Sequence, residues 1–311
     1  MKLALIISAL IISFSGQSQL SAYSSHREDS AVSCITHWKL GETKTYSIVH
    51  EKKSTNPPGK NPPFRFTYEA SISVIDSSAK NYTIKWIFHL PEEMSILRPR
   101  LADSLPVYNG MQMIFRITEM GEFVELLNWE EVRDAYARMM ELSLPKKMDS
   151  TAAAALQFAK NLYNSKEMVQ SSMIQEIQLF HRPYGYKFTT TETGSKTEIG
   201  NPFGGDPFPA IQTIRVSDPR PKADTFNLSF HLRIDKANTT SMIDPLLKKM
   251  NIKDDREMQV AREKYANFDM HDFSEYSFIR SNGWIRRLYY ERTVDIAGMT
   301  QSDAYTFTLK D

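Results

Sequence analysis

The feature that most constrains this chain is a two-residue alternation of apolar and polar side chains in long segments of both halves. The apolar members of the first two segments are Phe64, Phe66, Tyr68, Ala70, Ile72 and Val74, followed by Tyr82, Ile84, Trp86, Phe88 and Leu90. Alternation of this kind predicts strands with one face in a core and one face in water. Residues 76–81 are polar and turn-forming, so the two segments are predicted to form a hairpin.

The same alternation returns in the second half of the chain, at Phe226, Leu228, Phe230, Leu232 and Ile234. Further strands are predicted at residues 43–50, 111–118, 122–127, 186–199, 211–217, 273–281, 284–296 and 303–310. The Asn-Gly pair within residues 281–283 predicts a tight turn, because it tolerates the positive φ that such turns require. Alternating strands joined by short turns favour antiparallel pairing with one covered face.

Helices are predicted in two blocks, by apolar stripes with a helical period. The first block contains stripes at residues 132–140, 152–163 and 169–180, with Asn128 as a predicted N-cap three residues before Glu131. The second block spans residues 238–268. We therefore expect an α+β fold, in which a strongly curved antiparallel sheet of about ten strands is covered by amphipathic helices.

Two segments rich in proline and glycine, residues 56–63 and 201–209, are predicted to be irregular loops. The second segment is the predicted boundary between two α+β halves, residues 19–200 and 201–311. The alternative is that both halves form one continuous domain. Seven residues between Ile72 and Leu90 recur at one fixed offset between Ile214 and Leu232. The recurrence is consistent with two similar halves, but alternating strands also resemble each other by pattern alone.

The first eighteen residues have the three parts of a cleavable secretory signal peptide. Met1-Lys2 is basic, residues 3–14 are mostly apolar, and small residues precede a predicted cleavage before Gln19. The apolar run is shorter than the roughly 20 residues of a membrane-spanning helix, and no later stretch reaches that length. Residues 31–34 resemble a lipoprotein cleavage box but lie beyond the charged residues 26–29, so no lipid anchor is expected. We expect an exported protein, periplasmic or extracellular.

Charge and cysteine content exclude several classes of partner and chemistry. The formal net charge is +1, and no concentrated basic patch predicts nucleic-acid binding. Cys34 is the single cysteine, so no disulfide can form within the chain, and a small packing residue is the expected role.

Sequence motifs that carry catalytic chemistry are missing. The chain contains no G-x-S-x-G, no phosphate-binding glycine loop and no H-E-x-x-H, so no enzyme activity and no cofactor are expected. The nearest approaches to a metal site are Asp269 with His271 and Asp272, and the pair Met111 and Met113. Polar or packing roles explain both groups more simply, so no metal site is predicted.

Two segments resemble uncharacterised secreted or periplasmic proteins of the Bacteroidota, a set with no assigned activity. They are Trp38-Lys39-Leu40-Gly41-Glu42 with Tyr46, and residues 121–132, which read GEFVELLNWEEV. The resemblance implies an envelope or extracellular setting and assigns no catalytic residue. At the level of fold, the strand-rich and helix-covered pattern is also similar to the half-barrel lipoprotein carriers of the periplasm.

The leading functional hypothesis follows from the abundance of aromatic and methionine side chains at predicted core positions. Such an interior suits either an ordinary core or a cavity for an apolar ligand. We expect a non-catalytic envelope protein that holds an apolar small molecule or lipid between sheet and helices. The predicted lining residues are Tyr68, Trp86, Phe88, Phe230 and Tyr290.

Two alternatives from other classes stay open. The first is an interaction module that binds an envelope protein or a glycan through loop aromatics, for which Phe64, Phe203 and Phe208 are the candidates. The second is a hydrolase, which would need a cleft where His271 or another histidine meets a carboxylate and a nucleophile.

Overall fold

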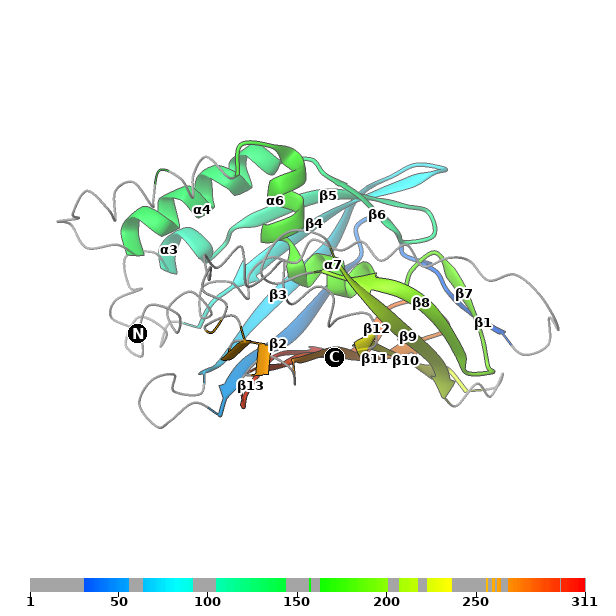
Figure 1. Ribbon diagram of the computed structural model, residues 1–311. Coiled ribbons are helices and arrows are strands. Elements are labelled where there is room, and N and C mark those ends of the chain that lie inside the picture. Colours follow the sequence, from blue (N-terminus) through cyan, green and yellow to red (C-terminus); the bar gives the residue numbers. More distant parts are fainter. Residues whose placement is uncertain are drawn as a thin grey trace.

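A computed structural model describes residues 31–55, 64–91, 105–143, 157, 163–200, 207–217, 223–236, 256, 259–260, 262–263, 268–296 and 298–310 of the 311-residue chain. Strands dominate these residues (Figure 1). They are β1 (Ala31–Cys34), β2 (Thr43–Ser54), β3 (Phe64–Ser77), β4 (Asn81–His89), β5 (Gln112–Thr118), β6 (Phe123–Leu126), β7 (Tyr186–Thr189), β8 (Thr193–Ile199), β9 (Phe208–Ser217), β10 (Thr225–Ile234), β11 (Asp269–Ile279), β12 (Ile285–Ile296) and β13 (Met299–Leu309). The helices are α3 (Leu105–Tyr108), α4 (Trp129–Ser143), α6 (Lys166–Met173) and α7 (Gln175–His181).

Eleven strands form one antiparallel sheet, in the order β6-β5-β4-β3-β2-β13-β12-β11-β10-β9-β8. Each strand pairs with its neighbour in the chain except where β2 pairs with β13, with His50 opposite Tyr305. That pairing joins strands from both predicted halves into one continuous sheet. The expected α+β fold built on an antiparallel sheet is therefore confirmed.

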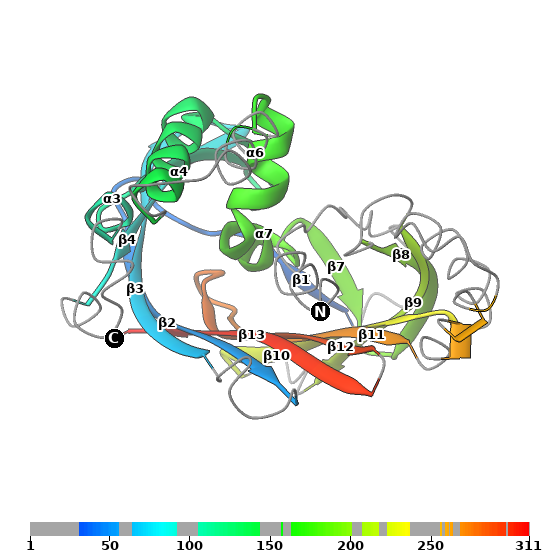
Figure 2. The same cartoon turned by 60° about the vertical axis from the view of Figure 1, so that its left-hand side comes forward.

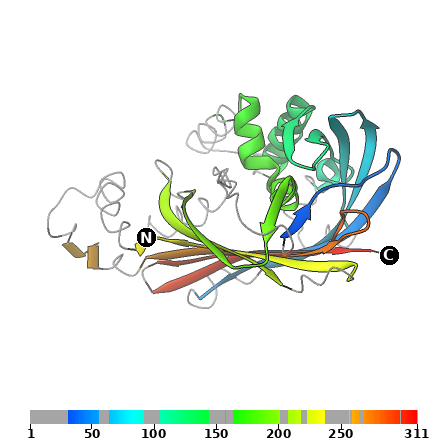
Figure 3. The same cartoon turned by 90° about the vertical axis from the view of Figure 1, so that its right-hand side faces the viewer.

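The sheet is curved into an open arch (Figure 2). Strands β10–β13 and β2 form its floor, while β3 and β4 rise on one side and β8 and β9 on the other. Helices α3, α4 and α6 stand on the concave side near β3–β5, and α7 lies inside the arch (Figures 2 and 3). The short sheet β1-β7 lies on the concave side as well.

Burial follows the two-residue period that the sequence predicts. In β10 every second residue from Phe226 to Ile234 is buried, and β11 and β12 show the same pattern. The inner face of the arch is therefore the core face. The third predicted helix stripe is also confirmed, since Val169, Met173, Ile177 and Phe180 are buried. It belongs to two helices, because Ile174 separates α6 from α7.

Local structure departs from the sequence prediction at two places. Residues 186–199 were predicted as one strand but form β7 and β8, and β7 pairs with β1, a strand of four residues that was not predicted. Asn128 precedes α4 as expected, yet its side-chain Oδ1 accepts from the amide of Ile114 at 2.8 Å, so it anchors β5. The other predicted helices, at 152–163 and 238–268, lie largely outside the described residues.

The predicted turns at residues 76–81 and 281–283 both occur between paired strands. Ser78 to Lys80 connect β3 to β4, and Gly283 has a φ of 73° between β11 and β12. The segments with recurring residues form two hairpins, β3-β4 and β9-β10. The division into two halves at residue 200 stays a prediction.

Candidate ligand-binding site on the inner face

The strand registers align inner-face residues into rows that cross the floor of the arch. One row is apolar and consists of Ile48, Phe307, Leu288, Tyr276, Leu228 and Val216. Four positions further along the strands, a second row contains Lys52, Asp303, Arg292 and Asp272. We call this second set the charged row, because its four members alternate in sign across four neighbouring strands.

The charged row is paired internally. The Arg292 guanidinium donates two hydrogen bonds of 2.7 Å to the Asp272 carboxylate. Asp303 lies 3.1 Å from the Lys52 ammonium and 2.7 Å from His50 Nε2. Exposed fractions are 2% for Asp272, 5% for Arg292 and 7% for Asp303. Buried charges are costly unless paired with good geometry, which this row supplies.

The pKa of Asp303 reflects two opposing effects. Burial alone would raise the pKa of this carboxyl, but hydrogen bonding from His50 and the charges of His50 and Lys52 outweigh it and lower the pKa. Asp303 is therefore ionised at neutral pH, and its partners stabilise that charge.

A second polar group lies where helices meet the sheet. Glu176 of α7 interacts electrostatically with Tyr68 of β3, Tyr108 of α3, Tyr136 of α4 and Tyr305 of β13. The Tyr68 hydroxyl donates to Glu176 Oε1 at 3.0 Å. Burial raises the pKa of each of the four tyrosines, and the Glu176 charge raises it further. We call these five residues the tyrosine–carboxyl cluster.

Neighbouring contacts hold the rings of this cluster in place. The Tyr136 hydroxyl donates to the carbonyl of Met173 at 3.2 Å, which ties α4 to the end of α6. The Tyr108 ring lies 4.9 Å from Phe88, and the Tyr305 ring stacks on His50 at 4.1 Å. The cluster thus connects the helices to the inner face of the sheet beside the charged row.

Glu176 differs from the carboxylates of the charged row. Burial raises its pKa above the ordinary glutamate value, although a backbone hydrogen bond, the Tyr68 hydrogen bond and the charge of His50 act in the opposite direction. No lysine, arginine or histidine among the described residues forms an ion pair with it. Glu176, Tyr108 and Tyr136 lie deep in the protein, yet each keeps a partly solvent-accessible side chain.

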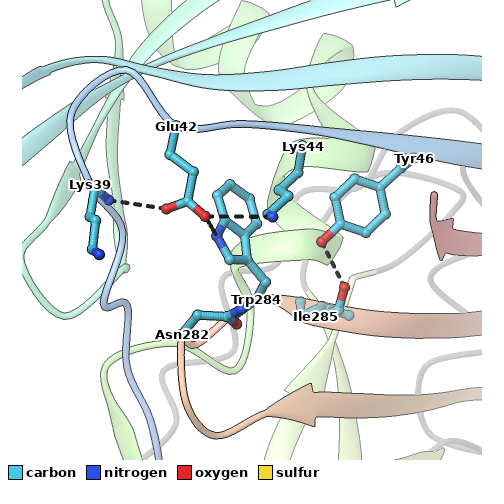
Figure 4. A network of polar contacts seen from close by, with 7 residues as sticks. All are labelled: Lys39, Glu42, Lys44, Tyr46, Asn282, Trp284 and Ile285. Carbon is cyan, nitrogen blue, oxygen red and sulfur yellow. Dashed lines mark hydrogen bonds and ion pairs between the residues drawn. The ribbon is translucent and has the colours of Figure 1, made fainter. Parts of the chain in front are cut away.

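Close-packed aromatic residues lie near the starts of β2 and β12, at the end of these strands away from the charged row. We call them the tryptophan end: Trp38, Tyr46, His181, Tyr184 and Trp284. Trp38 stacks on Trp284 with ring centroids 4.0 Å apart. Trp284 Nε1 donates to Glu42 Oε1 at 2.9 Å, and the Tyr46 hydroxyl donates to the carbonyl of Ile285 at 2.6 Å (Figure 4). These bonds fasten β12 to the start of β2.

The five predicted cavity residues are all buried on the inner face. Tyr68, Trp86 and Phe88 come together, with ring centroids 6.0 Å apart for Tyr68 and Phe88 and 6.2 Å for Trp86 and Phe88. Phe230 lies elsewhere, 5.7 Å from Tyr276, and Tyr290 lies in the floor opposite Tyr305. Tyr68 belongs to the tyrosine–carboxyl cluster and Phe88 contacts it.

The loop candidates have different surroundings. Phe64 begins β3, is half-buried, and its ring lies 5.3 Å from His50. Phe208 begins β9 and is buried against Phe268 at 5.5 Å, so it presents no exposed ring. Phe203 lies outside the described residues.

Strand geometry separates the residues considered for a metal site. His271 alternates with Asp272, so the two side chains leave β11 on opposite faces. Met111 and Met113 are buried in the core. Within the described ranges, no group of three or more histidine, cysteine, aspartate or glutamate side chains is placed to hold a metal ion.

Histidine contacts bear on the hydrolase alternative. His50 pairs with Asp303 on the inner face, whereas His89 lies 2.9 Å from the Ser71 hydroxyl on the outer face. In the part of the chain that the structure describes, no histidine contacts both a carboxylate and a hydroxyl or thiol. Cys34 is fully buried, and burial raises the pKa of its thiol well above the ordinary value.

Sequence reasoning missed Glu176 and the charged row. A signal was present for the row, since Asp272, Arg292 and Asp303 occupy core-phase positions between apolar residues of their strands. A polar residue at a position where the alternation predicts an apolar core residue indicates a structural or functional role. Glu176 had no such signal, because it sits in a short helix of seven residues that mixes half-buried polar and buried apolar side chains.

Comparison with known proteins identifies no family. No family model matches the chain, and no curated protein matches it. Among solved structures, a chain described under "Lipid-protein interactions in lipovitellin" is similar with a TM-score of 0.40 and 10% identity over 88% of this chain. The match covers 25% of that chain, and a likeness this distant assigns no ligand or mechanism. Separately, none of the helices in the described part is both long and apolar enough to cross a membrane.

Proposed function

We propose that the protein is an exported, non-catalytic binding protein that holds an apolar ligand between the inner face of its sheet and its helices. The observation that carries this proposal is a set of inner-face and helix side chains that are half-buried near the core and keep accessible surface. They are Phe66, Tyr108, Tyr136 and Glu176. In a fully packed core these side chains would have none.

The chemistry around this accessible surface suits an apolar occupant. Phe66 stacks on Tyr68 at 5.2 Å, and Tyr108 contacts Phe88. Leu90 is also partly buried against the same core. Ligand pockets are mostly lined by apolar and aromatic side chains with a few polar groups, which is the composition here.

The proposal is tested by two tryptophan substitutions on one strand. Phe66 faces inward and is half-buried, whereas its neighbour Thr67 faces outward and is exposed. Phe66→Trp should fill accessible space and weaken binding of the uncharged dodecyl glucoside at least about tenfold, which corresponds to about 1.4 kcal/mol. Thr67→Trp is the matched control and should bind like the wild type. Binding is measured by thermal shift and by native mass spectrometry of delipidated protein.

The outcome against the proposal is equally specific. A delipidated protein whose melting temperature does not respond to fatty acids, phospholipids or alkyl alcohols would count against any apolar ligand. Equal binding by both variants would place the ligand elsewhere.

Export is the second part of the proposal, and it rests on the features of residues 1–18. The measurement is N-terminal sequencing of the protein from its native cells. We expect a mature chain that begins at Gln19, and an intact Met1 on the functional protein would contradict export through cleavage.

A further inference from the structure

We propose that the tyrosine–carboxyl cluster binds a cationic group, an amine or a quaternary ammonium, at the polar end of the apolar ligand. This inference rests on the proposed function and names the chemical class of the ligand. A ligand of this class would be an amphiphile, with its charged end at Glu176 and its chain along the apolar side chains beside the cluster.

The first argument is the composition of the cluster. Four tyrosines from four elements interact electrostatically with one carboxyl group, and Tyr68 contacts that group directly, with 3.0 Å between the two oxygens. Aromatic faces attract cations, and cages of aromatic side chains bind quaternary ammonium ions. A carboxylate among the rings adds a full negative charge. This combination favours a cation over an anion or an uncharged polar group.

The second argument is the pairing of charges nearby. Every member of the charged row has an opposite partner, since Arg292 pairs with Asp272, and Lys52 and His50 with Asp303. Glu176 forms no such pair with any described residue, although it lies deep in the protein. An unpaired deep carboxylate is costly. A cationic ligand would supply the missing partner.

The third argument is the surroundings of the cluster. Phe66 stacks on Tyr68, and Phe88 contacts Tyr108, so apolar rings begin where the polar group ends. Glu176, Tyr108 and Tyr136 keep accessible surface at this place. One occupant can therefore meet the carboxylate and the apolar rings together.

An anionic end group is the competing class. It would use Lys52, which is half-buried on the inner face of β2. Lys52 already lies 3.1 Å from Asp303, so an anion there would compete with a carboxylate held by two partners. The structure therefore favours the cation, and the anion becomes an outcome of the test.

The experiment compares three amphiphiles with one dodecyl chain: dodecyltrimethylammonium, dodecyl glucoside and dodecyl sulfate, all below their micellar concentrations. Affinities are measured by calorimetry on wild type, Glu176→Gln and Glu167→Gln. Glu167 lies exposed on α6 and controls for loss of one negative charge. We expect the wild type to bind the cation at least about tenfold more tightly than the glucoside. Glu176→Gln should remove this preference, so that the cation binds no more tightly than the glucoside, while Glu167→Gln should behave like the wild type.

A pH titration of the wild type provides a second test that needs no variant. Protonation of Glu176 removes the charge that the cation would meet, so affinity for dodecyltrimethylammonium should fall as the pH is lowered, while affinity for the glucoside should not. Because the Glu176 pKa is raised, the fall should begin above the ordinary glutamate range.

Each outcome decides one claim. Tighter binding of the sulfate, equal binding of cation and glucoside, or an unchanged preference in Glu176→Gln would overturn the cationic end group and leave the apolar site standing. If none of the three amphiphiles binds the wild type, the proposed function itself fails.

Discussion

The two ends of the arch use similar residues for different purposes. At the tryptophan end, the hydroxyls of Tyr46 and Tyr184 donate to backbone carbonyls of Ile285 and Gly283. At the other end, the hydroxyl of Tyr68 donates to a side-chain carboxyl, Glu176. Both kinds of bond join distant segments, but only the second leaves a side-chain carboxyl group that can also contact a ligand.

The charged groups at the two ends also differ in their hydrogen-bond partners. Glu42 at the tryptophan end accepts from Trp284 and from the amide of Lys39, so it ties strands and loops together (Figure 4). Away from the tryptophan end, the charged row and Glu176 place five ionisable groups between the sheet and the helices. Apolar side chains at these positions would stabilise the fold at least as well. The comparison teaches that one end closes the arch and the other retains polar chemistry at a cost in stability.

The largest expected effect comes from breaking the charged row. Arg292→Met leaves the Asp272 carboxylate buried without its partner and should lower the free energy of unfolding by about 3 to 5 kcal/mol. The double variant Arg292→Met/Asp272→Leu removes both charges and should recover most of that loss. Urea denaturation of the three proteins measures both steps. A double variant as unstable as the single one would show that the row is needed for folding itself.

Next in size is a backbone effect at the tryptophan end. Gly283 has a φ of 73°, and a Cβ there would lie 2.1 Å from the carbonyl oxygen of Ile35. Gly283→Ala should therefore destabilise the protein by about 2 to 5 kcal/mol through strain and overlap. Gly298 has a φ of 76° with nothing within 4 Å of a Cβ, so Gly298→Ala isolates the conformational cost of about 1 to 2 kcal/mol. Equal losses in the two variants would contradict close packing at Gly283.

The third prediction concerns pH and His181. Burial lowers the pKa of this histidine from 6.5 to about 4, so the folded protein keeps the ring neutral while the unfolded chain takes up a proton between these values. The free energy of unfolding should fall as the pH drops through this window, by up to about 3 kcal/mol in total. His181→Phe should remove this contribution. Denaturation at a series of pH values compares the two slopes, and parallel curves would show that His181 does not titrate as described.

The smallest expected effect is at Glu176, and it has the opposite sign. Its raised pKa means that the folded protein binds this proton more tightly than the unfolded chain does. The contribution to stability is complete below the ordinary glutamate pKa of about 4.3 and is lost as the pH rises through the folded pKa. Glu176→Gln should therefore be more stable than the wild type at neutral pH and equal to it in acid. Thermal melts at both pH values measure the difference, and a less stable variant at neutral pH would point to a structural role.

Much of the arch could be predicted because the alternation of apolar and polar residues within a single strand indicates which of its faces is buried. The alternation from Phe226 to Ile234 needs no knowledge of the rest of the chain, and neither does the stripe that became α6 and α7. The same reasoning predicted that Tyr68, Trp86 and Phe88 face inward together.

The site itself depends on pairing that no local pattern contains. His50 meets Asp303 because β2 pairs with β13, which brings together residues 253 positions apart. Glu176 meets Tyr68 through the packing of α7 inside the arch, 108 positions away. β1 was missed because four residues provide too short a period to recognise. Local patterns therefore predict which face is buried, while register and helix docking determine which polar groups meet there.

The central claim, that an apolar ligand lies between the helices and the inner face, is tested most directly by photocrosslinking. A dodecyl glucoside analogue with a diazirine in its chain is bound to the protein and irradiated, and the modified residues are mapped by mass spectrometry. We predict modification within residues 64–68, 105–108 and 129–143, beside the tyrosine–carboxyl cluster. Modification confined to the tryptophan end or to the outer face of the sheet, or none that excess dodecyl glucoside competes away, would contradict the claim.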